Sequence, residues 1–150
     1  MKDLPIAEIT LRKYEQPSTL EGRDLVKKLC LSLGLLQPGD GRDVVVDIVT
    51  ILLRSKRENK TISLGEIKTQ VEKFRRENGL DIRGLAESNI RRQLRKLKDL
   101  LIIERINNQY RISEFEDLDK IFEDKIERFL LRGIMERVKD YLSEIKTKDF

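Results

Sequence analysis

The sequence lacks histidine and tryptophan, and it contains a single cysteine, Cys30, in 150 residues. Without histidine the chain cannot build the usual Cys/His zinc sites, a His-based catalytic triad or the common haem ligand sets. One cysteine also excludes an intramolecular disulfide. Because Cys30 sits among Leu29, Leu31 and Leu33, we expect it to be a buried, apolar side chain.

Long apolar runs are missing as well. No segment approaches membrane-spanning length, and the first ten residues, MKDLPIAEIT, lack the apolar region of a signal peptide. The sequence has no glycine-rich phosphate loop and no nucleophile elbow, and its carboxylates follow the polar sides of the predicted helices. We therefore expect a soluble, cytoplasmic protein that is not an enzyme and needs no metal or cofactor.

Charged residues are abundant, and their distribution is informative. They make up 39% of the sequence, equal to the apolar share, a balance typical of proteins from thermophiles. Residues 54–113 contain 16 Lys/Arg against 8 Asp/Glu, a net charge of +8. The preceding segment, 1–53, has a net charge of −1, and residues 114–150 have −3. Positive charge confined to one segment predicts an anion-binding surface, with nucleic acid as the leading candidate.

Residues 1–42 are predicted to form an N-terminal arm and a helix. The arm, residues 1–17, contains two prolines and a short apolar alternation, which indicate an extended segment or edge strand that docks on the rest of the protein. Ser18 and Glu21 match a capping box, so we expect a helix over about 19–33. Gly34 would end it.

Residues 43–57 contain a dense apolar run, DVVVDIVTILL, after a turn rich in proline and glycine. Its β-branched residues are compatible with a buried strand. Its length, together with capping candidates at Asp40 and Asp43, favours a helix that is buried nearly all round. Such a helix would be the centre of a small domain.

The basic segment follows with a regular order of elements. Thr61–Ser63 is β-prone, and Ser63 with Glu66 forms a second capping box for a helix over 64–78 that ends at Asn78-Gly79. One helical turn could start at Asp81. The apolar residues Ile90, Leu94, Leu97 and Leu101 then predict an amphipathic, basic helix over 86–100. An alternating stretch over 102–113 reads as a β-hairpin that turns at Asn107-Asn108.

Residues 114–150 are predicted to form a helical segment with an apolar stripe. Gly133 lies inside the stripe, so either one long helix or two helices hinged there would fit. The stripe could pack on the domain's own core, or it could pair with the same stripe of a second chain. We favour a dimer, because the stripe is longer than the domain needs. The predicted dimer interface contains Leu118, Phe122, Ile126, Phe129, Leu130, Ile134, Val138, Tyr141 and Ile145.

The order of elements over residues 43–113, and the run RKLKDLLIIERINNQYRIS within it, resemble the winged helix-turn-helix superfamily, in particular transcriptional regulators of archaea and bacteria. The resemblance covers about half of the chain. The family often has glycine just before the first strand of the wing, where this chain has Leu101. The fold class expected is mainly α with a small β-hairpin, a winged helix with an extra N-terminal helix and a long C-terminal helix.

The resemblance implies that helix 86–100 enters the major groove of double-stranded DNA and that hairpin 102–113 acts as the wing. A helical projection places basic and amide side chains opposite the apolar stripe, whereas Lys98 lies nearer the apolar side. Arginine can pair with guanine and asparagine with adenine. The predicted DNA-binding residues are Ser88, Asn89, Arg91, Arg92, Arg95, Lys96, Arg105, Asn107, Asn108 and Arg111.

Three functions fit these patterns. A dimeric transcriptional regulator that binds a specific DNA sequence fits best, with Asn89, Arg92 and Arg95 as base readers. A winged helix that serves as a protein-interaction scaffold in a larger assembly is the alternative, because fold does not settle function. The charged helix face would then be a solvated surface. RNA binding has little support, since Tyr110 is the only obvious aromatic residue for base stacking.

Overall fold

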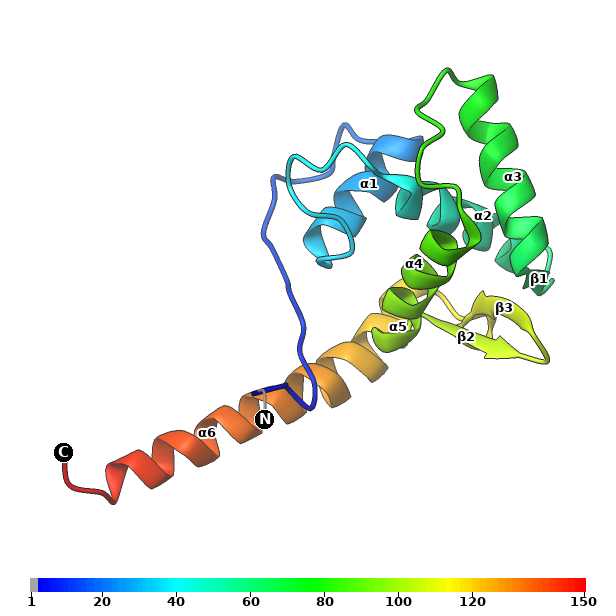
Figure 1. Cartoon of the computed structure of the whole chain (residues 1–150). Helices are drawn as coiled ribbons and strands as arrows, with labels where there is room; N and C mark the ends of the chain where they lie inside the picture. Colours follow the sequence, from blue (N-terminus) through cyan, green and yellow to red (C-terminus); the bar gives the residue numbers. More distant parts are fainter. Residues whose placement is uncertain (1–2) are drawn as a thin grey trace.

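The computed structural model describes residues 3–150, and it shows a mainly helical protein with a small three-stranded antiparallel sheet (Figure 1). None of the helices in this range combines the length and the apolar character needed to cross a lipid bilayer. In chain order the elements are α1 (Gly22–Ser32), α2 (Val44–Arg57), β1 (Ile62–Ser63), α3 (Leu64–Glu77), α4 (Glu87–Asp99), β2 (Ile103–Ile106), β3 (Gln109–Ile112), a 3₁₀ turn (Ser113–Phe115), α5 (Leu118–Ile121), η2 (Phe122–Leu131) and α6 (Arg132–Lys146).

Helix α2 is the centre of the hydrophobic core. It contacts α1, α3, α4 and β3, and almost all of its side chains up to Leu52 are buried. The β-branched run therefore forms a helix, as predicted, because neighbours on every side cover it and length favours a helix over a strand. Asp43 precedes the helix, but its carboxylate makes no capping hydrogen bond. Asp40 is also wrong as a cap, since it accepts from the backbone N–H of Arg42 in the preceding turn.

Helix α3 has both predicted ends. The Ser63 hydroxyl accepts a hydrogen bond from the backbone N–H of Glu66 at 3.2 Å. At the other end Gly79 adopts a left-handed conformation, φ +64°, and the next N–H bonds back to the Arg75 carbonyl. The helical turn expected from Asp81 is absent from the described residues, because the Asp81 carboxylate instead accepts from the backbone N–H of Arg83 in a tight turn.

The sheet has the order β1-β3-β2, and the β2–β3 hairpin has the predicted register. Ile106 pairs with Gln109, which leaves Asn107 and Asn108 as a two-residue turn. Both asparagines have positive φ, 51° and 62°, as a type I′ turn requires. Glu104 lies opposite Arg111, so two opposite charges pair across the strands.

The N-terminal region differs from the prediction at the helix start. Helix α1 begins at Gly22, and the Ser18–Glu21 capping box is wrong, because the Leu20 N–H bonds to the Pro17 carbonyl in a separate turn. From residue 3 to residue 17 the arm contains no strand. It docks instead through Arg12, whose guanidinium donates to the carbonyl of Leu31 in the last turn of α1 and to that of Leu36 in the segment after it.

Residues 118–146 form one continuous helical run that extends away from the rest of the molecule (Figure 1). Gly133 does not interrupt it, so the single-helix alternative holds. The stretch Phe122–Leu131 is π-helical. Ile121 and Ile126 are buried in the core together with residues of α1, α2 and α4, whereas α6 has no buried residue. The run therefore begins on the core and ends as a free helix.

Candidate nucleic-acid interface

Helix α4 is held by a narrow apolar face. Ile90, Leu94 and Leu97 are fully buried, as predicted, and they pack against the helices α2 and α3 and the strand β2. Leu100, 8% exposed, completes this face. Leu101 does not continue the helix, because its φ is +65°. The chain therefore turns sharply after α4 and enters the hairpin directly.

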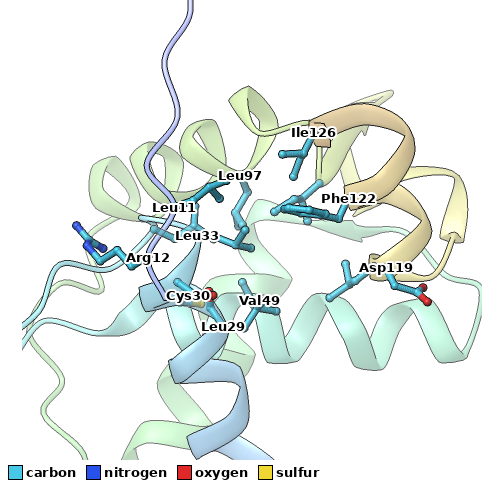
Figure 2. A pocket seen from close by; sticks show the side chains of 14 residues that line it. Leu11, Arg12, Leu29, Cys30, Leu33, Val49, Leu97, Asp119, Phe122 and Ile126 are labelled. Carbon is cyan, nitrogen blue, oxygen red and sulfur yellow. The ribbon is translucent and has the colours of Figure 1, made fainter. Parts of the chain in front are cut away.

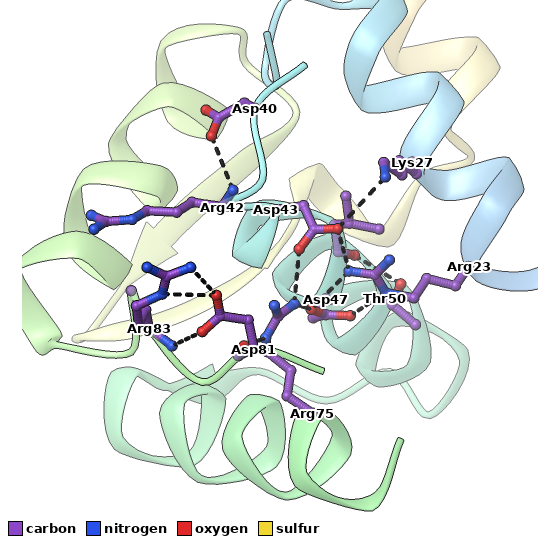
Figure 3. A network of polar contacts seen from close by, with 12 residues as sticks. Arg23, Lys27, Asp40, Arg42, Asp43, Asp47, Thr50, Arg75, Asp81 and Arg83 are labelled. Carbon is purple, nitrogen blue, oxygen red and sulfur yellow. Dashed lines mark hydrogen bonds and ion pairs between the residues drawn. The ribbon is translucent and has the colours of Figure 1, made fainter. Parts of the chain in front are cut away.

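A buried ion network fixes the segment that leads into α4 (Figure 3). Arg75 of α3 is 1% exposed, and its guanidinium donates to the Asp47 carboxylate of α2 at 2.5 Å. It also pairs with Asp43 at 3.1 Å. Its Nε donates to the backbone carbonyl of Asp81 at 2.6 Å. One side chain thus ties α3 to α2 and to the connector that precedes α4.

Arg23 extends the same network to α1. Its Nε donates to Asp47 at 2.9 Å, and its Nη2 lies 3.0 Å from Asp43. Burial by itself raises the pKa of Asp43, but the bonds and charges of Arg23 and Arg75 outweigh it, so the pKa lies below its usual value. The Asp43 carboxylate is therefore ionised at neutral pH. Arg23 and Arg75 both pair with Asp43 and Asp47, so the helices α1, α2 and α3 are joined at one point.

The outer side of α4 carries four exposed cationic side chains, with the carboxylates of Glu87 and Asp99 exposed near its two ends. Arg91, Arg92, Arg95 and Lys98 are exposed, and Ser88 lies with them near the helix N-terminus. Arg91 has a weak ion pair with Glu87 at 3.8 Å. Arg95 and Lys98 have no ion pair among residues 3–150. The prediction that Lys98 lies nearer the apolar side is wrong, because the opposite flank of the helix is the covered one.

Asn89 and Lys96 lie on that covered flank. The Asn89 amide donates to the carbonyl of Gly84 at 2.7 Å, and its oxygen accepts from Arg92 and Gln93. Lys96 donates to the carbonyl of Leu35, in the segment after α1, at 3.1 Å. Both side chains are thus engaged within the protein itself, and contact of Asn89 and Lys96 with DNA stays a prediction. Sequence reasoning had not placed the segment after α1 against α4.

The predicted contact residues of the hairpin differ in how exposed they are. Arg105, Asn107 and Asn108 are exposed, and the Arg105 guanidinium donates to Asn108 Oδ1 at 2.5 Å. Arg111 is half-buried, donates to Glu104 at 2.6 Å and stacks on the ring of Phe115. Arg111 is therefore occupied inside the sheet, so the exposed cation of the hairpin is Arg105.

Glu104 is held on two sides. Burial raises its pKa, but the hydrogen bonds from the backbone N–H of Glu114 and from the Arg111 guanidinium lower it by more. The pKa of Glu104 therefore lies below its usual value. The carboxylate is thus charged and bonded at neutral pH. The ion pair between Glu104 and Arg111 therefore stiffens the hairpin.

The predicted dimer stripe divides into two parts. Ile126 is 1% exposed in its own core, so its place in a dimer interface is wrong. Leu118, Phe122 and Leu130 are also packed partly against that core. The other members are on the free part of the helix: Ile134 is half-buried, and Phe129, Val138, Tyr141 and Ile145 are exposed. Met135 and Leu142, not included in the predicted interface, are exposed beside them.

Comparison with known protein families, with curated proteins and with solved structures gives no significant match to this chain.

Proposed function

We propose that this chain is a winged-helix protein that binds double-stranded DNA, with α4 in the major groove and the β2–β3 hairpin as the wing. The observation that carries the proposal is the cationic outer side of α4, which is followed directly by a hairpin whose turn region, residues 105–108, is exposed. A helix of this width fits the major groove, and arginine side chains can pair with guanine edges. The order helix, strand, helix, helix, hairpin supports the same assignment.

The side chains have distinct proposed roles. Arg92 and Arg95 read base edges, because they are exposed on the middle of the outer face. Arg91, Lys98 and Ser88 contact phosphates along the groove. Arg105 reaches the backbone or the minor groove from the wing. Asn89 has a supporting role, since its oxygen accepts from Arg92 and orients that guanidinium.

We further propose that the protein acts as a dimeric transcriptional regulator that recognises a specific DNA sequence. The exposed apolar residues of α6 provide the pairing surface. Two copies would present two α4 helices to two half-sites of one duplex. The negative charge of residues 114–150 keeps this helix away from the phosphate backbone.

Binding to duplex DNA across a series of salt concentrations tests the proposal. We expect affinity to fall steeply with salt, because each phosphate contact releases counterions. Replacing Arg92 and Arg95 together by alanine should weaken binding at least about tenfold, since two base contacts are lost. Fluorescence anisotropy with a labelled duplex selected from a random pool measures both effects.

A matched control separates position from charge. Arg128→Ala plus Arg137→Ala also removes two exposed arginines, but from the C-terminal helix. This variant should bind within about twofold of the wild type, since distant surface charges are screened. If both double variants bind equally, α4 is not the reading helix. If the wild type binds no duplex at all, the protein-interaction scaffold becomes the better assignment.

A further inference from the structure

An apolar pocket of about 540 Å³ lies on the side of the core that faces the N-terminal arm (Figure 2). Leu11 of the arm and Leu33 of the segment after α1 form one side. Cys30 and Val49 lie on another, and Phe122 comes from the C-terminal helix. The volume falls within the usual range for sites that bind small organic molecules.

The pocket is built where several parts of the fold meet. Leu97 of α4 and Ile102, just before β2, also line it, so it borders the back of the proposed DNA-reading unit. Phe122 and Ile126 belong to the π-helical stretch. Such stretches are rare in helices and are frequent at functional sites. This backbone irregularity is a second observation, independent of the volume, that points to a binding role.

The chemistry of the walls defines the ligand. The lining is almost entirely hydrocarbon, and burial raises the pKa of the Cys30 thiol to about 12, so this wall does not stabilise negative charge. Arg12 and Asp119 lie at opposite edges, and both point away from the interior (Figure 2). The Arg12 guanidinium is already bonded to Leu31, Leu36 and Gln37. The interior therefore offers no partner for an ionised group.

We propose that this pocket binds a neutral, apolar small molecule, such as linked aromatic rings or a medium-length hydrocarbon chain. The driving force is removal of the ligand's apolar surface from water. This site is separate from the proposed DNA-binding surface, and it stands whether or not the chain binds DNA.

Titration of the full chain with N-phenyl-1-naphthylamine, a neutral two-part aromatic probe, tests the proposal by fluorescence. We expect saturable binding at one site per chain, with the emission shifted toward the blue as the probe leaves water. Val49→Phe directs an aromatic ring into the pocket and should weaken probe binding at least about tenfold, because the added ring takes the ligand's place. Where this variant does not fold, Cys30→Met is the second variant, with a loss of about threefold expected from its smaller added volume.

The exposed residues of α6 provide the matched control. Met135→Ser plus Leu142→Ser removes two exposed apolar side chains far along the helix and leaves the pocket lining unchanged. This variant should bind the probe like the wild type. If instead it loses the probe while Val49→Phe keeps it, the probe is on α6 and the pocket assignment is overturned. Absence of saturable binding to the wild type overturns it as well.

Competition by two ligands of equal chain length tests the neutral character. Displacement of the probe by 1-decanol should be at least about tenfold more effective than displacement by decanoate at neutral pH, since only the carboxylate brings a charge into the apolar interior. Equal or better displacement by decanoate contradicts the neutral class. A third outcome is that the wild type does not bind the probe and that Val49→Phe abolishes self-association. The pocket would then be part of an interface between two copies, and the proposal would be wrong.

Discussion

Arg75 shows how one residue can position a surface that it does not touch. Its guanidinium is buried between two carboxylates of the α2 region and also bonds the Asp81 carbonyl. A buried charge is tolerated only when its partners surround it, and these partners come from separate elements. The entry into α4 is thus determined by the same ion network that holds α3 on the core.

Removal of Arg75 should therefore be costly. Arg75→Met keeps a similar apolar stem but leaves the buried carboxylates of Asp43 and Asp47 with Arg23 as their main partner. We expect a loss of about 3–5 kcal/mol in the free energy of unfolding, the usual effect of breaking a buried ion pair from one side. Urea unfolding followed by circular dichroism measures it.

The next residue along the chain is a matched control. Arg76 is exposed and has only an i,i+4 ion pair with Glu72 at 3.5 Å. Arg76→Met should change the unfolding free energy by less than about 0.5 kcal/mol, as expected of an exposed pair. Similar losses for both variants would show that the buried network does not carry the stability assigned to it.

The sequence alone could not distinguish these two arginines. Arg75 and Arg76 are adjacent and identical in type, and the apolar period of α3 runs through Phe74 just before them. Phe74 is only half-buried, whereas Arg75 is completely buried. Tertiary partners reversed the pattern, because two carboxylates from α2 and its N-cap position compensate the charge. Asp43 was assigned to a cap for the same reason, since a capping residue and a buried ion partner look alike in a sequence.

At the scale of elements, the junction between α4 and the hairpin both ends the helix and starts the hairpin. The Ile102 N–H bonds to the Leu97 carbonyl, and the Leu101 N–H bonds to the Lys98 carbonyl. This is a Schellman motif, and its left-handed position is usually glycine. Leu101 stands where winged-helix proteins often have glycine, and it adopts the positive φ that glycine tolerates best.

Substitutions at Leu101 should reveal this backbone conformation. Leu101→Val should lower the unfolding free energy by about 1–2 kcal/mol, because β-branched residues tolerate positive φ poorly. Leu101→Gly should change it by less than about 1 kcal/mol, since the relieved backbone offsets the lost half-buried side chain. Thermal and urea unfolding compare the two.

Leu53→Val provides the reference for an ordinary leucine. Leu53 is half-buried inside α2, where φ is helical. Its replacement should cost less than about 1 kcal/mol, through propensity and one lost methylene. Should Leu53→Val and Leu101→Val be equally destabilising, the left-handed conformation would not explain the effect at Leu101.

Local signals predicted most elements well, and tertiary contacts explain the exceptions. The Ser63 cap, Gly79, and the Asn107-Asn108 turn encode their own backbone geometry, and these positions were confirmed. The start of α1 was not, because the turn after Pro17 satisfies the local backbone in another way. On α4 the apolar period identified the buried face, but the covered flank depends on Leu35, sixty-one residues away. No local pattern contains that contact.

At the scale of the whole molecule, the division of the C-terminal helix is the main property that periodicity could not show. One apolar stripe runs from Leu118 to Ile145, yet its first part packs on the core and its second part is free. The apolar pocket could not be predicted either, because its walls come from the arm, from α1, α2 and α4, from the start of the C-terminal helical run and from Ile102 just before β2. The sequence predicts the elements that line the pocket but not how they are placed around it.

The free part of the stripe has the spacing of a coiled coil. Leu131, Ile134, Val138, Tyr141 and Ile145 are separated alternately by three and four residues. Val138 and Tyr141 are 52% and 66% exposed, although they are large and apolar. Pairing with the same helix of a second copy would cover them and bring two α4 helices into one particle.

Disruption of this surface should give a monomer. We expect the wild type to be a dimer in light scattering, and Val138→Asp plus Tyr141→Asp to be a monomer, because two carboxylates per chain would be buried without partners. Lys139→Asp, on the polar face of the same helix, changes the net charge by the same amount and should remain dimeric. The fold should be kept in all three proteins, since these side chains do not contact the core.

The salt dependence of DNA binding should be about half as steep for the monomer, since one copy neutralises half as many phosphates. A wild type that stays monomeric, or a Lys139→Asp variant that dissociates like the double variant, would show that α6 does not pair through this stripe.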